Sequence, residues 1–498
     1  MSNVVEAARG PGRPKAGGAT NKPRVDIKLD QHFNSRVYTS GSTVAGNVVV
    51  QCQRDTPFES FEIGFTGVAA SRMDFVQSYT TNSVRTFMKL HMPIPESDLP
   101  ASRIFEAGHA YNIPFHFVVP HHLTMGACNH GCAIPAVQDQ HLRLPPTLGY
   151  WDGDDQAPDM THIEYAVRAA MMGPSRAGDP NPPLAEGKKI IKVLPAAGEE
   201  PPLDINFMDK RYCLSKTKSM RKNILGPKAG ELTVSSSQPE AVMVHADGFG
   251  ADGTTARISL EFAPSTADAA PPKINSVTGK LISTTFFGSA PTDTLPNLGP
   301  KTTYSHNQVL TYSATTNLFN TRPNKVSWSE HHISTARRDS GYSTAGSPDE
   351  FTSEDDAENQ VRVRRGSKGK NKKTQGPPIR HRATLDFPVN VPVSNKKTFV
   401  PTFHSCIISR TYVLQLVVSV GPSNTTMTLN VPVQLGVERR FEPQGEELPS
   451  FESAIAQASE DDAAAYLRPR SVEIPMTSMP YDMLPRYGEF SRRSVAVA

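Results

Sequence analysis

Residues 398–438 read TFVPTFHSCIISRTYVLQLVVSVGPSNTTMTLNVPVQLGVE, the most regular stretch of the chain. Every second residue from Tyr412 to Val420 is apolar, and after a polar turn at 421–426 the alternation resumes from Met427 to Val437. A period of two is typical of strands with one buried face, so the stretch predicts a long antiparallel hairpin. Because Pro432 has no N–H to donate, we expect its strand at a sheet edge or at a bulge.

The same period of two recurs in shorter runs along the rest of the chain. These runs are bounded by Gly, Asn, Ser or Asp, and no segment shows a long helical period. Short strands with frequent turns are typical of β-sandwiches rather than of alternating strands and helices. The runs are 25–29, 44–50, 61–65, 86–94, 111–119, 162–172, 258–262 and 383–393.

Length and composition limit the possible classes of protein. A chain of 498 residues exceeds what one hydrophobic core serves, so we expect two domains and additional segments. Only 37% of the residues are apolar and 43 are proline, which indicates that a substantial part is not packed. The net charge of +3 selects no partner. Five cysteines, an odd number, form no disulfide framework, and a reducing compartment fits them.

Composition shifts divide the chain into five segments. Residues 1–24 are predicted as a disordered basic N-terminus, 25–194 as a first β-sandwich and 195–229 as a linker and irregular segment. Residues 230–438 are predicted as a second sandwich that contains a disordered charged insertion at 334–382, and 439–498 as a flexible tail. The chain shows neither a signal-peptide core nor an apolar run of about 20 residues, so we expect a soluble intracellular protein.

An ordered series of short motifs runs through both predicted sandwiches. The first half has Tyr-x-x-Gly, Val-x-Gly-x-Val, Phe-x-Gly and Gly-x-x-Tyr-x-Ile-Pro-Phe-x-Phe-x-x-Pro, and the second half has Pro-x-Phe followed by Ser-Arg-Thr-Tyr. Together they resemble the arrestin-like N- and C-terminal domains of fungal alpha-arrestins, the arrestin-related trafficking adaptors. The residues that carry the resemblance are Tyr38, Gly41, Gly46, Gly108, Tyr111, Pro114, Phe115, Pro120, Pro401, Phe403, Arg410 and Tyr412.

The resemblance implies a fold and a function. The fold is all-β, with two tandem immunoglobulin-like β-sandwich domains. The function is that of an adaptor which binds cytoplasmic segments of membrane transporters or receptors and recruits a NEDD4-type WW-domain ubiquitin ligase for endocytosis. Such a protein is cytoplasmic and peripheral at the plasma membrane or endosomes, is not an enzyme, and needs no cofactor and no small-molecule substrate.

The tail carries two degenerate ligase-binding motifs. Leu484, Pro485 and Tyr487 form a Leu-Pro-x-Tyr sequence, in which proline presets an extended backbone and the tyrosine ring fills a groove of a WW domain. Around Pro449 and Phe451 the sequence resembles the Pro-Pro-x-Tyr tail motif of the alpha-arrestins, with Phe in place of Tyr. The chain contains no Pro-Pro-x-Tyr, which leaves open a second hypothesis, a signalling or trafficking scaffold without ligase coupling.

Two other motifs suggest ligand sites, and for each we favour a structural interpretation. The glycine-rich segment 248–253 matches Gly-x-Gly-x-x-Gly, but a strand is predicted after it, where a dinucleotide site needs a helix. Cys128, His130 and Cys132, with His121 and His122 upstream, offer soft metal ligands. A structural zinc site usually has a second ligand pair, and the sequence shows none nearby, so no metal site is predicted. Motifs of a catalytic nucleophile or phosphate loop are absent from the sequence.

Basic segments support a third hypothesis, nucleic-acid binding. Residues 9–15 resemble an AT-hook core, and 362–373 form a basic cluster that also suits an anionic membrane surface. We rank nucleic-acid binding last, because it leaves two sandwiches without a role. Ser347, Ser353 and Ser367 lie beside the basic cluster, and their phosphorylation would offset its charge.

Overall fold

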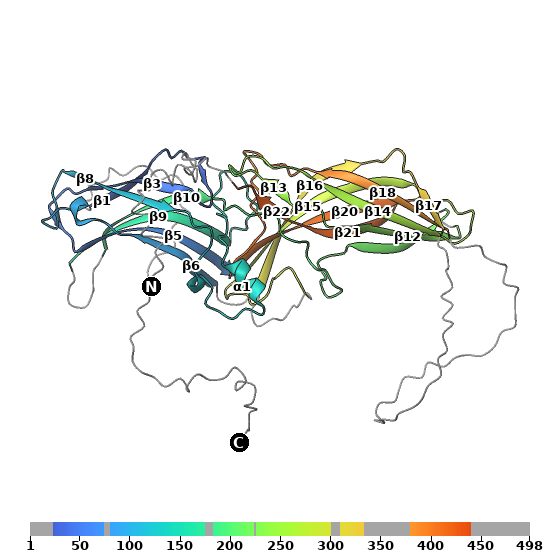
Figure 1. Ribbon diagram of the computed structural model, residues 1–498, viewed down its shortest axis with the longest axis horizontal. Helices are drawn as coiled ribbons and strands as arrows, with labels where there is room; N and C mark the ends of the chain where they lie inside the picture. Colours follow the sequence, from blue (N-terminus) through green and yellow to red (C-terminus); the bar gives the residue numbers. More distant parts are fainter. Residues whose placement is uncertain are drawn as a thin grey trace, which may run out of the picture. The chain divides into compact units, whose positions relative to one another are not determined.

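The structure, a computed structural model, describes residues 23–73, 80–174, 183–223, 226–299, 309–332 and 379–439 (Figure 1). All of them fall in one compact unit, Met1–Arg440. The described part is almost entirely β-strand, with one α-helix and two short 3₁₀ turns. The all-β prediction is therefore confirmed.

The first sandwich consists of a three-stranded and a five-stranded sheet. All strand pairs in these sheets are antiparallel except the parallel pair β2 and β10. The three-stranded sheet has the order β1 (Arg24–Leu29), β3 (Thr43–Gln51), β8 (Ala110–Val118). The five-stranded sheet has the order β2 (Val37–Tyr38), β10 (Pro183–Val193), β9 (Thr161–Met172), β5 (Ser60–Met73), β6 (Thr81–Met92). A small ladder joins β4 (Thr56–Pro57) to β7 (Ile104–Phe105).

Strand β8 illustrates how sequence alternation builds the first core. Ile113, Phe115 and Phe117 are buried, and the residues between them are exposed. Successive side chains of a strand point to opposite faces, so one face of β8 covers the core. Pro114 pairs with Asn47 on β3, and β8 is the last strand of its sheet, as expected for a proline that cannot donate to a ladder.

Three motif glycines have distinct structural roles. Gly41 and Gly108 have φ angles of 86° and 75°, a region that residues with a Cβ rarely adopt. Gly46 lies in β3, where an added Cβ would be 2.1 Å from the Lys28 carbonyl oxygen. Gly41 and Gly108 therefore permit turns, whereas Gly46 permits the close approach of β1.

The second sandwich also has two main sheets. One has the order β11 (Ser215–Arg221), β12 (Lys228–Ser236), β14 (Thr254–Pro264), β18 (Ile379–Val389), β17 (Ser329–His332). The other has the order β16 (Val309–Thr321), β15 (Ile274–Gly288), β20 (Ile408–Val420), β19 (Phe403–His404), with β21 (Thr425–Val433) also paired to β20. A separate parallel pair joins β13 (Val242–Val244) to β22 (Leu435–Val437).

The predicted hairpin is formed by β20 and β21, and its apolar face is buried. Tyr412 pairs with Val433, and Val420 pairs with Thr425. Pro432 lies on β21, whose other side makes, among the described residues, one isolated bridge from Asn430 to Cys213, so the expected edge position is confirmed. The buried alternating residues are Tyr412, Leu414, Leu416, Val418, Val420, Met427, Leu429 and Val431.

The second hairpin strand ends earlier than the sequence predicts. Leu435 and Val437 belong to β22, which leaves β20 and pairs in parallel with β13. The edge of β20 beyond Tyr412 is taken by β19, since Arg410 pairs with Phe403. No ladder position on β20 therefore remains for Leu435.

Two predicted irregular segments contain strands. Strand β11 lies within 195–229. Met220 is its only buried residue, so the segment has no apolar alternation from which a strand could be predicted. A charged, exposed strand suits the edge position that β11 occupies. Strand β18 begins at Ile379, inside the predicted insertion, and its Arg380 and Arg382 form ion pairs with Glu261 on β14.

The cores of the two sandwiches meet and exchange residues. The first core is built mostly from residues before 194, yet several apolar side chains from the second half of the chain pack into it. In the other direction, Leu194 joins the second core. The second-half residues in the first core are Phe287, Val400, Phe403, Cys406, Ile407 and Ile408. We call this contact region the junction.

Candidate functional site

The predicted ligase-binding and phosphorylation residues lie outside the described residues. These are Leu484, Pro485, Tyr487, Pro449 and Phe451 in the tail, and Ser347, Ser353 and Ser367 in the insertion. The same holds for the basic segments 9–15 and 362–373. A candidate functional site can therefore be described only in the two sandwiches and at their junction.

The motif residues of the resemblance belong to the packed body. Tyr38 and Phe115 are buried in the first core, and the ring of Tyr111 packs edge-on against Phe105. Pro120 is half-buried at the end of the same sheet. Pro401, Phe403, Arg410 and Tyr412 lie together at the junction and are all buried.

Within the described part of the chain, Arg410 is the largest completely buried side chain, with none of its surface exposed. Its Nε donates to Thr285 Oγ1 at 2.9 Å, on the neighbouring strand β15. Its two terminal nitrogens donate to the carbonyl oxygens of Asp155 and Gln156, at 3.0 and 3.1 Å, in the first sandwich. One guanidinium group of the second sandwich therefore holds a loop of the first, since charged donors make the stronger hydrogen bonds.

The loop that Arg410 holds also contains a buried carboxylate. Asp155 accepts hydrogen bonds from the backbone N–H groups of Gly149 and Ala157, at 2.5 and 3.1 Å. Burial raises the pKa of the Asp155 carboxyl, whereas these hydrogen bonds and the positive charge of Arg410 oppose the rise. The adjacent Gln156 accepts a hydrogen bond from Ser283 Oγ at 2.6 Å, which adds a further link between the sandwiches.

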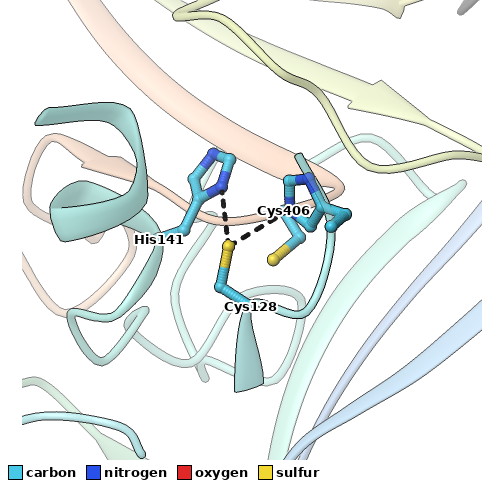
Figure 2. A group of neighbouring side chains, drawn as sticks. Cys128, His141 and Cys406 are labelled. Carbon is cyan, nitrogen blue, oxygen red and sulfur yellow. Dashed lines mark hydrogen bonds between the residues drawn. The ribbon is translucent and has the colours of Figure 1, made fainter. Parts of the chain in front are cut away.

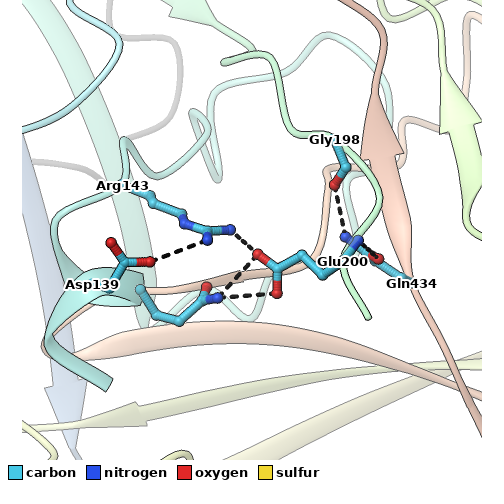
Figure 3. Close-up of polar contacts among 6 residues, drawn as sticks. Asp139, Arg143, Gly198, Glu200 and Gln434 are labelled. Carbon is cyan, nitrogen blue, oxygen red and sulfur yellow. Dashed lines mark hydrogen bonds and ion pairs between the residues drawn. The ribbon is translucent and has the colours of Figure 1, made fainter. Parts of the chain in front are cut away.

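A second polar cluster at the junction is centred on Glu200, in the segment between the sandwiches (Figure 3). Its carboxylate accepts from Gln140 Nε2 at 3.0 Å and forms an ion pair with Arg143, which also contacts Asp139. The backbone N–H of Glu200 donates to Gln434 Oε1 at 2.8 Å, and Gln434 Nε2 donates to the Gly198 carbonyl oxygen. Glu200 therefore connects helix α1 (Pro135–His141), and Arg143 two residues beyond it, with the link between β21 and β22.

A cleft adjoins the Glu200 cluster. Its walls come from the first sandwich, the intervening segment and the second sandwich. His404 lies in its wall, and burial lowers the pKa of this imidazole to about 3. Other lining residues include Gln140, Tyr212, Asn297 and Tyr412.

Cysteine and histidine side chains converge near helix α1 (Figure 2). The ligand atoms of Cys128, His130, His141 and Cys406 all lie within 4.8 Å of one another. Cys128 Sγ is 3.3 Å from His130 Nε2 and 3.7 Å from His141 Nδ1. Burial lowers the pKa of His141 to about 4 and raises that of Cys406 to about 12.

The sequence motif identified only part of this cluster. His141 is on a seven-residue helix with no apolar period, and Cys406 lies in the second sandwich, so neither gives a local signal. The histidines considered in their place, His121 and His122, are exposed and do not belong to the group of converging ligand atoms.

A second group, His245, Asp252 and Glu438, is more open, and Asp252 is exposed. It adjoins the glycine-rich segment 248–253. Strand β14 begins directly after Gly253, as predicted, so this segment does not meet the start of a helix. The arrangement is that of a loop between strands and not of a dinucleotide fingerprint.

Comparison with protein families finds a match in the second half of the chain. Residues 307–437 match the family model described as the Bul1 C terminus, which includes β20, β21 and the junction residues around Arg410. The match covers about a quarter of the chain, and this part is similar to an arrestin-related family of trafficking adaptors. No curated protein matches the chain significantly. Among the described residues, no helix is long and apolar enough to cross a membrane.

Proposed function

We propose that this chain is an arrestin-related trafficking adaptor, which binds cytoplasmic segments of membrane transporters or receptors and couples them to a NEDD4-type WW-domain ubiquitin ligase. The observation that carries the proposal is the match of residues 307–437 to the Bul1 C terminus, in a chain whose two sandwiches pack against each other. The adaptor performs no chemistry of its own and acts at the plasma membrane or endosomes through its partners. The sandwiches bind the cargo, and the tail recruits the ligase.

The loop before β11 offers a contact for cargo. Phe207 is 83% exposed and Met208 lies beside it, also exposed. The loop is rigidly supported, because the buried Asp209 accepts from the backbone N–H groups of Asn206 and Gly299, at 2.8 and 2.6 Å. An exposed aromatic residue on a fixed loop is the kind of anchor that dominates protein interfaces.

Cargo binding is expected to depend on this loop. In proximity labelling by the full-length chain in cells, Phe207→Ser with Met208→Ser should reduce labelling of membrane transporters at least about fivefold, the effect of removing an anchor worth about 1 kcal/mol. Phe33→Ser is the matched control, because Phe33 is 61% exposed on the first sandwich. Equal transporter labelling by both variants would exclude the loop as the cargo contact.

Ligase recruitment is expected to depend on the tail. A single Leu-Pro-x-Tyr motif is expected to bind a WW domain at roughly 10–100 μM, so retention in a pulldown requires both tail motifs or clustered WW domains. Tyr487→Ala with Phe451→Ala should lower retention of the full chain on immobilised WW domains at least about tenfold, since both aromatic anchors are lost. Tyr481→Ala is the control, because Tyr481 follows a proline in the same tail but lacks the Leu-Pro-x-Tyr spacing. Undiminished retention of the double variant contradicts ligase coupling through these motifs.

The second candidate function is a scaffold without ligase coupling. It is favoured by the absence of Pro-Pro-x-Tyr from the sequence. Under this alternative, transporter labelling remains while WW-domain retention is absent in the unmodified chain. Nucleic-acid binding through 9–15 and 362–373 ranks third, and salt-sensitive DNA retention lost on deletion of both segments would favour it.

A further inference from the structure

Four cysteine and histidine side chains from both sandwiches bring their possible ligand atoms within 4.8 Å of one another. We propose that Cys128, His130, His141 and Cys406 bind a structural zinc ion that fastens the junction. This inference is independent of the proposed function, because it concerns only how the two sandwiches are held. It rests on the spacing of the ligand atoms, their chemical type, their burial and the supports of the loop that carries them.

The spacing fits the edges of a zinc tetrahedron. Zinc lies about 2.3 Å from sulfur and about 2.0–2.1 Å from nitrogen, so tetrahedral ligand atoms are roughly 3.3–3.8 Å apart. Cys128 Sγ lies 3.3 Å from His130 Nε2 and 3.7 Å from His141 Nδ1. Cys406 Sγ lies within 4.8 Å of each of the other three ligand atoms, so small side-chain adjustments close the site.

The donor set selects the metal. Two thiols and two imidazoles provide sulfur and nitrogen and no oxygen, which suits zinc and disfavours calcium and magnesium. Four protein ligands leave no open coordination position, as is usual for a structural rather than a catalytic zinc site. All five cysteines of the chain are free thiols in the structure, so neither Cys128 nor Cys406 is used in a disulfide.

Burying the polar groups of this cluster costs free energy unless they bind a partner such as a metal ion. Cys128, His141 and Cys406 are each almost completely buried. The polar partners of His141 Nδ1 within hydrogen-bonding reach are the sulfur atoms of Cys128 and Cys132, at 3.7 and 3.9 Å, which are weak hydrogen-bonding groups. A buried imidazole nitrogen beside sulfur atoms that hydrogen-bond weakly is explained by a metal ion that it ligates together with Cys128.

The loop that carries Cys128 is fixed in place from several directions. Arg85 on β6 donates to the Ala127 carbonyl oxygen and to Asn129 Oδ1, each at 2.9 Å. The N–H of Ala133 donates to the Asp293 carbonyl oxygen in the second sandwich, at 2.8 Å. His141 is held at the end of helix α1, which begins with Pro135, a residue favoured at the first helical position. The ligands are thus positioned by the fold itself.

Because Cys406 belongs to the second sandwich, a zinc ion at this site would link the two sandwiches. Cys128, His130 and His141 belong to one loop and helix after β8, whereas Cys406 lies between β19 and β20 of the second sandwich. A zinc ion bound by all four would join the sandwiches on the side of the junction where Phe403 and Ile407 pack into the first core. Cys132, whose Sγ is 3.8 Å from Cys128 Sγ, lies beside the site as a nearby thiol outside the ligand set.

The test measures zinc in the full chain, purified without a histidine tag. We expect about one zinc per chain by elemental analysis, the stoichiometry of a four-ligand structural site. Cys406→Ser and His141→Ala should each lower the zinc content at least about tenfold. Cys213→Ser, a thiol elsewhere in the second sandwich, and Cys132→Ser should retain it. Absence of zinc from the unmodified chain, or zinc retained in Cys406→Ser, overturns the proposal.

Measurements on the unmodified chain cover the case in which a variant fails to fold. Removal of zinc by a strong chelator should lower the thermal midpoint, and zinc but not magnesium should restore it. Cobalt in place of zinc should give the visible spectrum of a tetrahedral ion with two thiolate ligands. A disulfide between Cys128 and Cys132 in a non-reducing digest, or an octahedral cobalt spectrum, contradicts the site.

Discussion

Arg410→Met is expected to lower the free energy of unfolding by about 3–5 kcal/mol, because three buried oxygen acceptors lose a charged donor, at roughly 1–3 kcal/mol each. The substitution keeps an unbranched side chain of similar length but removes the donors to Thr285 and to the carbonyl oxygens of Asp155 and Gln156. It also removes the positive charge that opposes the raised pKa of Asp155. Chemical denaturation of the full chain measures the loss.

The pH dependence of the lost stability shows how much of it comes from the charge of Asp155. Burial raises the pKa of Asp155 above its unfolded value, so its charged form destabilises the fold at neutral pH and protonation relieves that cost. Without Arg410 the pKa of Asp155 rises further. The variant should therefore recover part of its stability as the pH is lowered from 7 toward 5, a range in which the unmodified chain changes less.

Arg257→Met is the matched control for Arg410→Met. Arg257 also belongs to a strand of the second sandwich and contacts the Asp386 carboxylate through Nε at 2.9 Å, but it is exposed. Exposed ion pairs contribute little because water screens them, so this variant should unfold close to the unmodified chain. If both substitutions lowered the free energy of unfolding equally, the hydrogen bonds of Arg410 at the junction would not stabilise the fold more than an exposed ion pair does.

Phe403→Ala is expected to destabilise the first sandwich, although Phe403 belongs to the second half of the chain. Its side chain is buried in the first core, and removal of a buried phenylalanine ring costs about 3–5 kcal/mol. Hydrogen exchange should therefore show weaker protection of the first-sandwich strands β5 and β8. The same measurement in the outer strands of the second sandwich should show a smaller change.

An exposed phenylalanine provides the comparison for Phe403. Phe249 lies on the loop before β14 and is about half exposed, so Phe249→Ala should change the stability by no more than about 0.5 kcal/mol. If Phe403→Ala weakened protection only in the second sandwich, the two cores would behave as independent units. The exchange of residues across the junction predicts the opposite.

The sequence by itself determined the local structure. Alternation of apolar residues predicted the hairpin of β20 and β21, because only one face of each strand meets the core. The same alternation predicted strands such as β8. Pro432 by itself predicted an edge position or a bulge, since a proline has no N–H to donate. The charged strand β11 was missed, because an edge strand needs little burial and leaves no apolar pattern.

Only the tertiary structure decided what meets at the junction. Cys128 and His130 form a visible motif, whereas His141 joins them through the fold of the loop and helix after β8, and Cys406 joins them through the packing of the second sandwich against the first. In the same way, Arg410 was visible as a motif residue, whereas its partners at Asp155 and Gln156 come from a distant loop. Periodicity reports which face of a strand is buried. It contains no information on which distant side chains share a buried site, because that depends on how whole sheets pack.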